Sequence, residues 1–150
     1  MKHFRTATRR NLDRRLAGLR EQFETLPPPG WIRTMRDALG MSTYELANRI
    51  GLSQTRVRQF ETAEIEGSIR LTTLRRAADA LNCRLLYVFV PNESLEDMVH
   101  ARARSKAATL LGVADPDALE NEAQDLRELQ ELQRLEDLAM DLVDRPGLWS

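Results

Sequence analysis

The sequence predicts a mainly α-helical protein with one short β-strand and helical arms at both ends of the chain. Three observations lead to this prediction. Aromatic residues make up only 5% of the 150 residues and charged residues 30%, a balance more typical of helical proteins than of β-sandwiches. Proline and glycine divide most of the chain into segments of helix length. A single run, residues 84–90, has the aliphatic and aromatic composition of a strand.

Residues 1–26 are predicted to form a basic N-terminal helical arm. Apolar residues recur in residues 11–26 at spacings of four and three, the pattern of a short coiled-coil seam. They are Leu12, Leu16, Leu19, Phe23 and Leu26. So short a helix is marginally stable alone, and we expect it to pack on the body of the protein or on a second copy of the chain. Residues 27–30, with the sequence PPPG, cannot be helix interior and are predicted to be an extended linker.

Four short helices are predicted between residues 31 and 82. Ser42 and Glu45 have the spacing of a capping box that opens the second helix. Gly51 ends that helix, because glycine adopts the left-handed conformation readily. Ser53 is the expected N-cap of the third helix. The predicted helices span residues 31–39, 43–50, 54–63 and 73–81, with a loop at residues 64–71 before the fourth.

Residues 83–91 are predicted to contain a dimerisation strand. The segment RLLYVFV precedes Pro91, and one strand cannot satisfy its own backbone polar groups. Since no other segment has a strand pattern, the simplest solution is antiparallel pairing with the same strand of a second chain about a two-fold axis. A buried continuation of the preceding helix is the alternative. The strand residues are Arg84, Leu85, Leu86, Tyr87, Val88, Phe89 and Val90.

Residues 94–150 are predicted to be helical and acidic. Ser94 caps a helix over residues 95–111, which Gly112 ends. Asp115 and Pro116 place a cap and a first-turn proline before a last helix at residues 117–143.

Charge is distributed unevenly along the chain. Residues 1–36 carry a net charge of +6 and residues 111–150 carry −8, although the whole chain carries only −1. This asymmetry indicates two partners, or a tail that folds back on the head. Two apolar residues near the C-terminus, Leu148 and Trp149, are candidate anchors for a partner protein. The alternative is that the acidic arm packs on the protein's own dimer.

Residues 43–61, with the sequence TYELANRIGLSQTRVRQFE, have the organisation of a helix-turn-helix. Ala47 is small where the second helix crosses the first, Gly51 permits the turn, and Ser53 starts the second helix. Apolar side chains on both helices are expected to fix the angle between them. This predicted core comprises Leu46, Ala47, Ile50, Gly51, Leu52, Val57 and Phe60.

The second helix of this pair has the side chains of a major-groove reader. Glutamine bonds bidentately to adenine, arginine bonds to guanine, and threonine contacts the thymine methyl group. We expect base contacts from Gln54, Thr55, Arg56, Arg58 and Gln59, and phosphate contacts from Thr43, Arg49, Ser53, Arg70 and Arg75. The alternative is that these residues are ordinary polar side chains on two solvent-exposed helices. The spacing of Ala47, Gly51 and Val57 instead favours binding to double-stranded DNA.

Other function classes are disfavoured. Cys83 is the only cysteine, which excludes an intramolecular disulfide and a multi-cysteine zinc site. The two histidines, His3 and His100, lie far apart, so no metal site is predicted. We find no nucleophile–base set and no phosphate-binding glycine loop, and therefore expect no enzyme, no cofactor and no small-molecule substrate. No apolar run approaches the ~20 residues that span a bilayer and no secretory signal begins the chain, so we expect a cytoplasmic protein without membrane contact.

Residues 31–82 resemble the Cro/C1-type (Xre) helix-turn-helix family. The matching residues are Ser42, Leu46, Ala47, Gly51, Ser53, Val57 and Glu61. Many members carry glutamine where this chain has Thr43. The stretch LTTLRRAADALNCRLLYVFV also resembles HipB-type antitoxin repressors, in which a strand after the last helix pairs across the dimer. A homodimer of this kind reads an inverted-repeat operator, with its recognition helices about 34 Å apart.

A longer resemblance covers nearly the whole chain. The segments LDRRLAGL, PPPGWIRTMRDALGMS, AEIEGSIRLTTLRRAADALNCRLLYVFVPNESLEDMV and ARSKAATLL are similar to the mobile mystery protein A family. Members are typically encoded beside mobile mystery protein B, a Fic-domain protein. The resemblance implies a sequence-specific DNA-binding antitoxin that neutralises a Fic-type toxin encoded by the adjacent gene and represses its own operon.

One class of Fic antitoxins carries an inhibitory helix with the pattern Ser/Thr-x-x-x-Glu-Gly/Asn. Residues 62–67, TAEIEG, match it, which makes Thr62, Glu66 and Gly67 candidate toxin-inhibitory residues. The alternative is a loop that only orders the turn into the next helix. Two other functions remain open at the level of the whole chain. One is a stand-alone phage-type transcriptional repressor, and the other is a protein-only toxin inhibitor that uses the helix-turn-helix as a scaffold.

Overall fold

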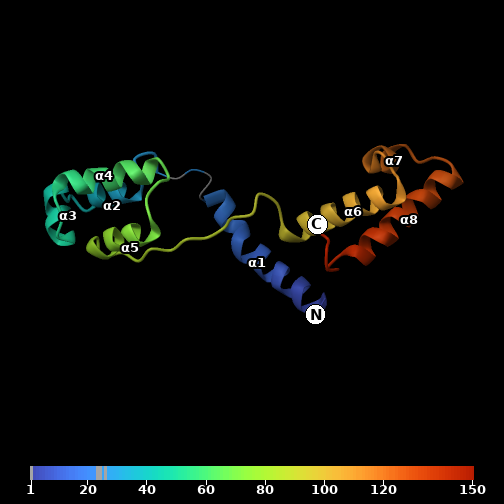
Figure 1. Ribbon diagram of the computed structural model, residues 1–150, viewed down its shortest axis with the longest axis horizontal. Coiled ribbons are helices and arrows are strands. Elements are labelled where there is room, and N and C mark those ends of the chain that lie inside the picture. Colours follow the sequence, from blue (N-terminus) through green and yellow to red (C-terminus); the bar gives the residue numbers. More distant parts are fainter. Residues whose placement is uncertain (1, 23–24, 26) are drawn as a thin grey trace. The chain divides into compact units, whose positions relative to one another are not determined.

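The computed structural model describes residues 2–22, 25 and 27–150, with the backbone alone at residues 2, 3 and 122. The described residues form eight α-helices (Figure 1). The chain divides into two compact units. The central unit comprises residues 23–89, and the terminal unit comprises residues 1–22 together with residues 90–150.

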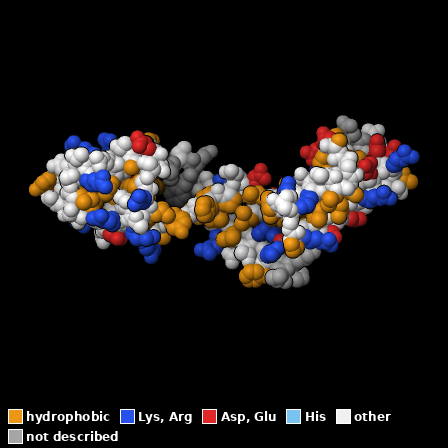
Figure 2. All heavy atoms as spheres, in the orientation of Figure 1, with side chains coloured by type: hydrophobic (Ala, Val, Ile, Leu, Met, Phe, Trp, Pro, Cys, Tyr) orange, Lys and Arg blue, Asp and Glu red, His pale blue; other side chains and the backbone are white. Residues whose placement is uncertain are grey.

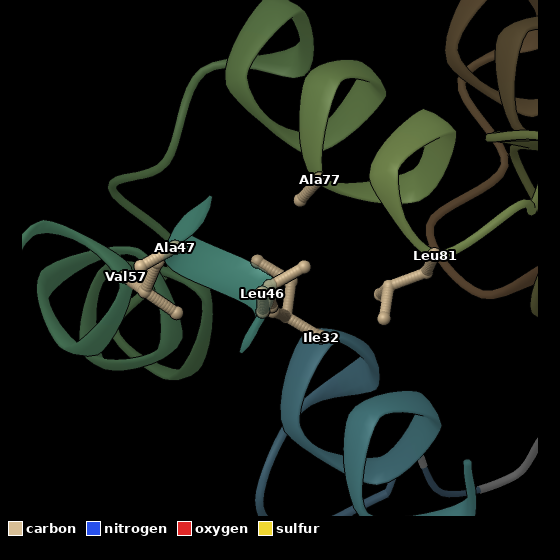
Figure 3. Close-up of a cluster of buried hydrophobic side chains, with 6 residues drawn as sticks. All are labelled: Ile32, Leu46, Ala47, Val57, Ala77 and Leu81. Atoms are coloured by element: carbon tan, nitrogen blue, oxygen red, sulfur yellow. The ribbon is translucent and has the colours of Figure 1, made fainter. Parts of the chain in front are cut away.

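The central unit packs four helices around one apolar core. They are α2 (Trp31–Ala38), α3 (Thr43–Ile50), α4 (Gln54–Ile65) and α5 (Leu71–Ala80). Each helix buries at least one side chain against the others, and Figure 3 shows these side chains converging. Their removal from water is the main force that holds the short helices together. The buried residues are Ile32, Leu46, Ala47, Val57, Ala77 and Leu81.

The predicted signals at the ends of α3 and α4 are confirmed. The Ser42 hydroxyl accepts from the Glu45 amide at 3.2 Å, and the Glu45 carboxylate accepts from the Ser42 amide at 2.7 Å. The Ser42 hydroxyl also donates to this carboxylate, and these bonds lower the pKa of Glu45. Gly51 ends α3 with φ of 78°, and the Ser53 hydroxyl caps α4 by accepting from the Arg56 amide at 3.2 Å.

The largest differences from the predicted helix bounds in this unit lie at the end of α4 and at the start of α5. Helix α4 continues to Ile65, two residues beyond the predicted end, so the loop starts later than expected. Helix α5 begins at Leu71 rather than Thr73, because the Arg70 carbonyl accepts from the amides of Thr73 and Leu74, both at 3.0 Å. Arg70 is therefore the N-cap of α5, whereas the sequence suggests Thr72, directly before the predicted start of this helix.

The structure does not support the strand predicted at residues 83–91. Residues 83–90 have no regular secondary structure, and the described part of the chain contains no β-strand with which they could pair. The alternative of a buried helix is not found either, since α5 ends at Ala80. The segment instead leaves large apolar side chains exposed, including Leu86, Tyr87 and Phe89, the last at 88%.

The terminal unit contains α1 (Lys2–Gln22), α6 (Leu95–Leu111), α7 (Pro116–Glu122) and α8 (Leu126–Leu142). Its core is rich in alanine on α6, and small side chains let neighbouring helices approach closely. The buried residues are Ala103, Ala107, Ala108, Leu135, Ala139 and Leu148.

The last helix was expected to be continuous over residues 117–143, and this is wrong. The chain leaves the helix at Ala123 and starts α8 after Asp125. The Asp125 carboxylate accepts from the Arg127 and Glu128 amides at 2.8 and 2.9 Å, and Glu128 completes a capping box. The signals at Ser94, Gly112 and Asp115 are confirmed as caps of α6 and α7.

Helix α1 packs on α6 through polar contacts more than through its apolar stripe. The Arg9 guanidinium donates to Glu96 at 2.7 Å and to Asp144 at 2.5 Å. The Asp13 carboxylate accepts from the Leu95 amide at 2.7 Å, at the start of α6. Of the predicted seam, Leu12 is exposed, Leu16 and Leu19 are half-buried, and Phe23 and Leu26 lie outside the described residues.

Candidate nucleic-acid interface

Helix α4 separates a buried face from an exposed one. Val57 is fully buried and Phe60 half-buried, and both contribute to the core of the central unit. The five residues predicted to contact bases are all exposed. They are Gln54, Thr55, Arg56, Arg58 and Gln59. The helix is therefore held rigidly by one side while it offers amide, hydroxyl and guanidinium groups on the other.

Two contacts within α4 orient the Arg56 side chain. Its Nη1 donates to the Gln59 Oε1 at 3.0 Å, and its guanidinium carbon lies 5.8 Å from the centroid of the Phe60 ring. A guanidinium near an aromatic ring is attracted by the ring's quadrupole. Arg56 and Gln59 lie about one helical turn apart, and their hydrogen bond holds them together as one polar surface. Both side chains remain exposed.

The turn before α4 is held by short-range backbone bonds. The amides of Gly51 and Leu52 both donate to the Ala47 carbonyl at 2.9 Å. Ala47 is only 2% exposed, so a larger side chain has no room there. Leu46 is fully buried, whereas Ile50 and Leu52 are half-buried. These contacts fix the angle at which α4 leaves α3.

The residues predicted to contact phosphates are placed less uniformly. Thr43 is half-buried at the first position of α3, and the Ser53 hydroxyl is used as the cap of α4. The Arg49 Nε donates to the Ala80 carbonyl at 2.6 Å, which ties this side chain to the end of α5. Arg70 and Arg75 are exposed at the start and in the middle of α5.

Thr43 also lines a depression that the sequence did not predict. Its volume is about 350 Å³, and arginines from α2 and α4 surround it. Backbone amides at a helix start and arginine side chains are both common phosphate ligands. The lining residues are Arg33, Arg36, Thr43, Arg58, Glu61, Thr62 and Ile65.

An ion pair between α2 and α4 positions this region. The Arg36 Nε donates to the Glu61 Oε1 at 2.8 Å, and the two side chains are 11% and 12% exposed. This hydrogen bond raises the pKa of Arg36, which keeps the pair charged. Arg36 also donates to the Met41 carbonyl at 2.9 Å, at the start of the turn into α3. Sequence spacing alone gives no signal for this pair, because 25 positions separate its members.

Glu64 forms a second link between the same helices. Its carboxylate accepts from the amides of Trp31 and Ile32 at 2.8 and 2.9 Å, and so caps the N-terminus of α2. Gly30 has φ of 79°, and a Cβ at this position would lie 2.8 Å from the Glu64 Oε2. The glycine of the predicted linker is therefore needed for the close approach of this carboxylate.

Acidic side chains of the central unit are largely engaged in structural contacts. Glu45, Glu61 and Glu64 each hold a cap or an ion pair. Arginine side chains, by contrast, are spread over the face of this unit seen in Figure 2, among apolar and uncharged groups. The exposed arginines on this face would interact favourably with a polyanion.

The predicted toxin-contacting residues fall in both units. Thr62 is exposed in the last turns of α4, Glu66 is its exposed C-cap, and Gly67 follows with φ of 72°. Leu148 is only 4% exposed and belongs to the core of the terminal unit, so its side chain is not available as an anchor. Trp149 is 62% exposed.

Residues 32–88 match the helix-turn-helix family model. The chain contains a Cro/C1-type helix-turn-helix domain. This match covers α2 to α5 and most of the irregular segment after them, and such domains serve sequence-specific DNA binding by transcriptional regulators. No curated protein and no solved structure matches the chain.

The described residues offer neither a metal-binding cluster nor a membrane-spanning helix. No group of three or more His, Cys, Asp or Glu side chains is placed to hold a metal ion. No helix in the described part of the chain is long and apolar enough to cross a membrane.

Proposed function

We propose that the protein is a transcriptional regulator that reads operator DNA with α4 of its helix-turn-helix domain. The observation that carries this proposal is the exposed polar face of α4. The opposite face of this helix packs into the core through the buried Val57. Base contacts from this face would come from Gln54, Thr55, Arg56, Arg58 and Gln59. Each good bidentate contact contributes about 1–3 kcal/mol of discrimination against a wrong base.

The test is operator binding by the Arg56→Ala/Gln59→Ala variant. We expect this variant to lose preference for the DNA upstream of its own gene over a shuffled duplex. Arg127→Ala/Gln130→Ala is the matched control, because it changes the same residue types at the same spacing on exposed positions of α8. Equal loss of preference in both variants, or in neither, contradicts the assignment of α4 as the reading helix.

The proposed regulator acts as a homodimer on an inverted-repeat operator. Support comes from Leu86, Tyr87 and Phe89, whose apolar side chains lie exposed on a segment without backbone partners in the described chain. Leu86 and Tyr87 also line an apolar groove of about 670 Å³, together with residues that include Trp31 and Leu71. Pairing of this segment with its copy in a second chain would cover both features.

Sedimentation of a Val88→Pro variant tests the dimer. Proline removes a backbone donor and is rarely found inside a sheet, so the variant is expected to sediment as a monomer. Leu126→Ser is the control, because it changes an exposed leucine on α8 and leaves the segment intact. A wild-type protein that sediments as a monomer at micromolar concentration contradicts the dimer.

We further propose that the regulator is an antitoxin for a Fic-type toxin encoded by the adjacent gene. Support comes from the similarity to the mobile mystery protein A family and from the exposed Glu66, which stands in the pattern of an inhibitory helix. The second contact proposed for the toxin is the exposed Trp149. The test compares Glu66→Ala and Trp149→Ala with wild type for their ability to protect cells that express the neighbouring toxin gene. If both variants protect the cells as well as wild type does, neither residue contacts the toxin in the way proposed.

Binding to the upstream DNA, with and without the product of the adjacent gene, separates the three functions. An antitoxin that represses its own operon binds the DNA tightly, and the neighbour shifts that binding. A stand-alone phage-type repressor binds DNA and ignores the neighbour. A protein-only inhibitor forms a complex with the neighbour and binds no DNA.

A further inference from the structure

We propose that helix α1 carries a second DNA-binding surface, which contacts the phosphate backbone next to the operator and reads no bases. This inference rests on the proposed function, because it needs the helix-turn-helix domain to bring DNA to the protein. It concerns three arginines of the terminal unit: Arg10, Arg14 and Arg15. We call them the α1 arginine face.

Polar contacts tie the inner face of α1 to the rest of the terminal unit. Arg9 is paired with Glu96 and Asp144, and Asp13 caps α6 through the Leu95 and Glu96 amides. At the other end of the helix, the Arg20 Nε donates to the Pro91 carbonyl at 2.9 Å. These contacts fix the rotation of α1 about its axis, so the residues between them on the opposite side point away from α6.

The α1 arginine face is exposed and uncompensated. Arg10, Arg14 and Arg15 are all exposed, and none of them forms an ion pair with a described residue. The only acid in the stretch from residue 10 to residue 15 is Asp13, which is already bound to the start of α6. Arginines one turn apart on a helix repel each other, and no neighbouring carboxylate on α1 offsets this repulsion.

The helix backbone beside these arginines is also open. Gly18 lies on the exposed side of α1, and a Cβ built on it meets no atom within 4 Å. Glycine weakens a helix interior, and no packing contact in the unit requires it here. An exposed, basic helix surface with a small residue allows close approach of a polyanion, and guanidinium groups bind phosphate oxygens in a bidentate way.

Duplex DNA is the occupant that these observations favour over an acidic protein. The α1 arginine face presents three exposed guanidinium groups, and phosphate contacts need only charge and accessible donors. The helix-turn-helix domain of the same chain would hold the duplex at high local concentration. Contacts of this kind add affinity to every sequence equally and increase its dependence on salt.

The experiment measures the affinity of the full chain for a labelled duplex from upstream of its gene at several salt concentrations. Each phosphate contact contributes about 0.9 to the slope of log affinity against log salt. The variant Arg10→Ala/Arg14→Ala/Arg15→Ala is therefore expected to reduce the slope by about 2.7 for each bound chain. Between 50 and 200 mM salt, wild type should lose about 40-fold more affinity than the variant.

Matched variants separate charge loss from misfolding. Arg127→Ala/Arg134→Ala removes two exposed arginines from α8 of the same unit and is expected to keep the wild-type slope. Arg10→Lys/Arg14→Lys/Arg15→Lys keeps the charge and is expected to retain most of the slope. The same loss on a shuffled duplex would support a contact that carries no sequence information.

Two results overturn the inference, and they are distinguishable. If the triple alanine variant keeps the wild-type slope while Arg56→Ala/Gln59→Ala loses operator preference, the α1 arginine face does not bind DNA and the proposed function stands. If wild type binds no duplex at any salt concentration, the proposed function and the inference both fall.

Discussion

Replacing Glu64 by alanine is expected to destabilise the central unit by about 2 kcal/mol. Both carboxylate oxygens accept from amides at the start of α2, at 2.8 and 2.9 Å. Loss of a side-chain cap costs about 1 kcal/mol and up to about 2, and hydrogen bonds to charged groups contribute about 1.5–3 kcal/mol each. Glu64 is half-buried, so water replaces the lost acceptor only in part, and we take about 2 kcal/mol as the expected cost.

The chain contains an internal reporter for this measurement. It has two tryptophans, Trp31 in the central unit and Trp149 in the terminal unit. In a Trp149→Phe background, fluorescence follows the unfolding of the central unit alone. With an m-value of about 1 kcal/mol/M in urea for so small a unit, the midpoint should fall by about 2 M.

Glu66→Ala is the matched control, because it removes an exposed glutamate two positions further along the chain. Exposed substitutions of this kind change stability by less than about 0.5 kcal/mol. If Glu64→Ala and Glu66→Ala shift the midpoint equally, the carboxylate of Glu64 does not hold α2 and the reasoning is refuted. A Gly30→Ala variant extends the test: its Cβ clashes with the Glu64 carboxylate, so it should destabilise less when Glu64 is already alanine.

Three further predictions concern stability. The bonds from Arg9 lower the pKa of Asp144 and the pKa of Glu96. Carboxylates whose pKa is lowered by folding stabilise the fold above their ordinary values of about 4 and lose this effect as acid protonates them, so the terminal unit should weaken as the pH falls below about 4. Trp149 fluorescence in a Trp31→Phe background measures this, and a wild-type acid transition that Arg9→Ala leaves unchanged would contradict it. Thr34→Val should stabilise the central unit by about 1 kcal/mol, because the buried Thr34 hydroxyl has no hydrogen-bond partner among the described residues; a lower urea midpoint would count against this. Gly18→Ala should stabilise the terminal unit by about 1 kcal/mol, since open space surrounds the new methyl group, and a loss of stability would mean that α1 is packed on that side.

Local signals in the sequence predicted much of the helix-turn-helix domain. Ser42, Gly51 and Ser53 act within one turn of their own positions, so their roles follow from residue type and spacing. The exposed polar face of α4 follows for the same reason, because residues on one helix share a face at fixed intervals. The break before α8 is also encoded locally, by the capping box of Asp125 and Glu128, but the cap and first-turn proline at Asp115 and Pro116 predicted one helix up to residue 143.

Contacts between residues far apart in the sequence could not be predicted from residue type and spacing. Arg36 finds Glu61 across 25 positions, and the docking of α1 depends on Arg9 and Asp144, which are 135 positions apart. Helix α1 was expected to pack by its leucines, yet its inner face is mainly polar. The segment after α5 has a strand composition, but a strand needs a partner, and composition does not say whether the partner lies in the same chain.

The meeting of both ends of the chain in the terminal unit has a consequence for the order of synthesis. Helix α1 leaves the ribosome before the other described helices, but its partner Asp144 is made 135 residues after Arg9. At about 5–20 residues per second, α1 waits for roughly 7–27 s before its docking site is complete. The central unit, whose contacts lie within residues 23–89, is translated entirely during that interval. A nascent chain would therefore present a folded helix-turn-helix domain while α1 is still unprotected, and the terminal unit would gain its stability only after Asp144 has been made.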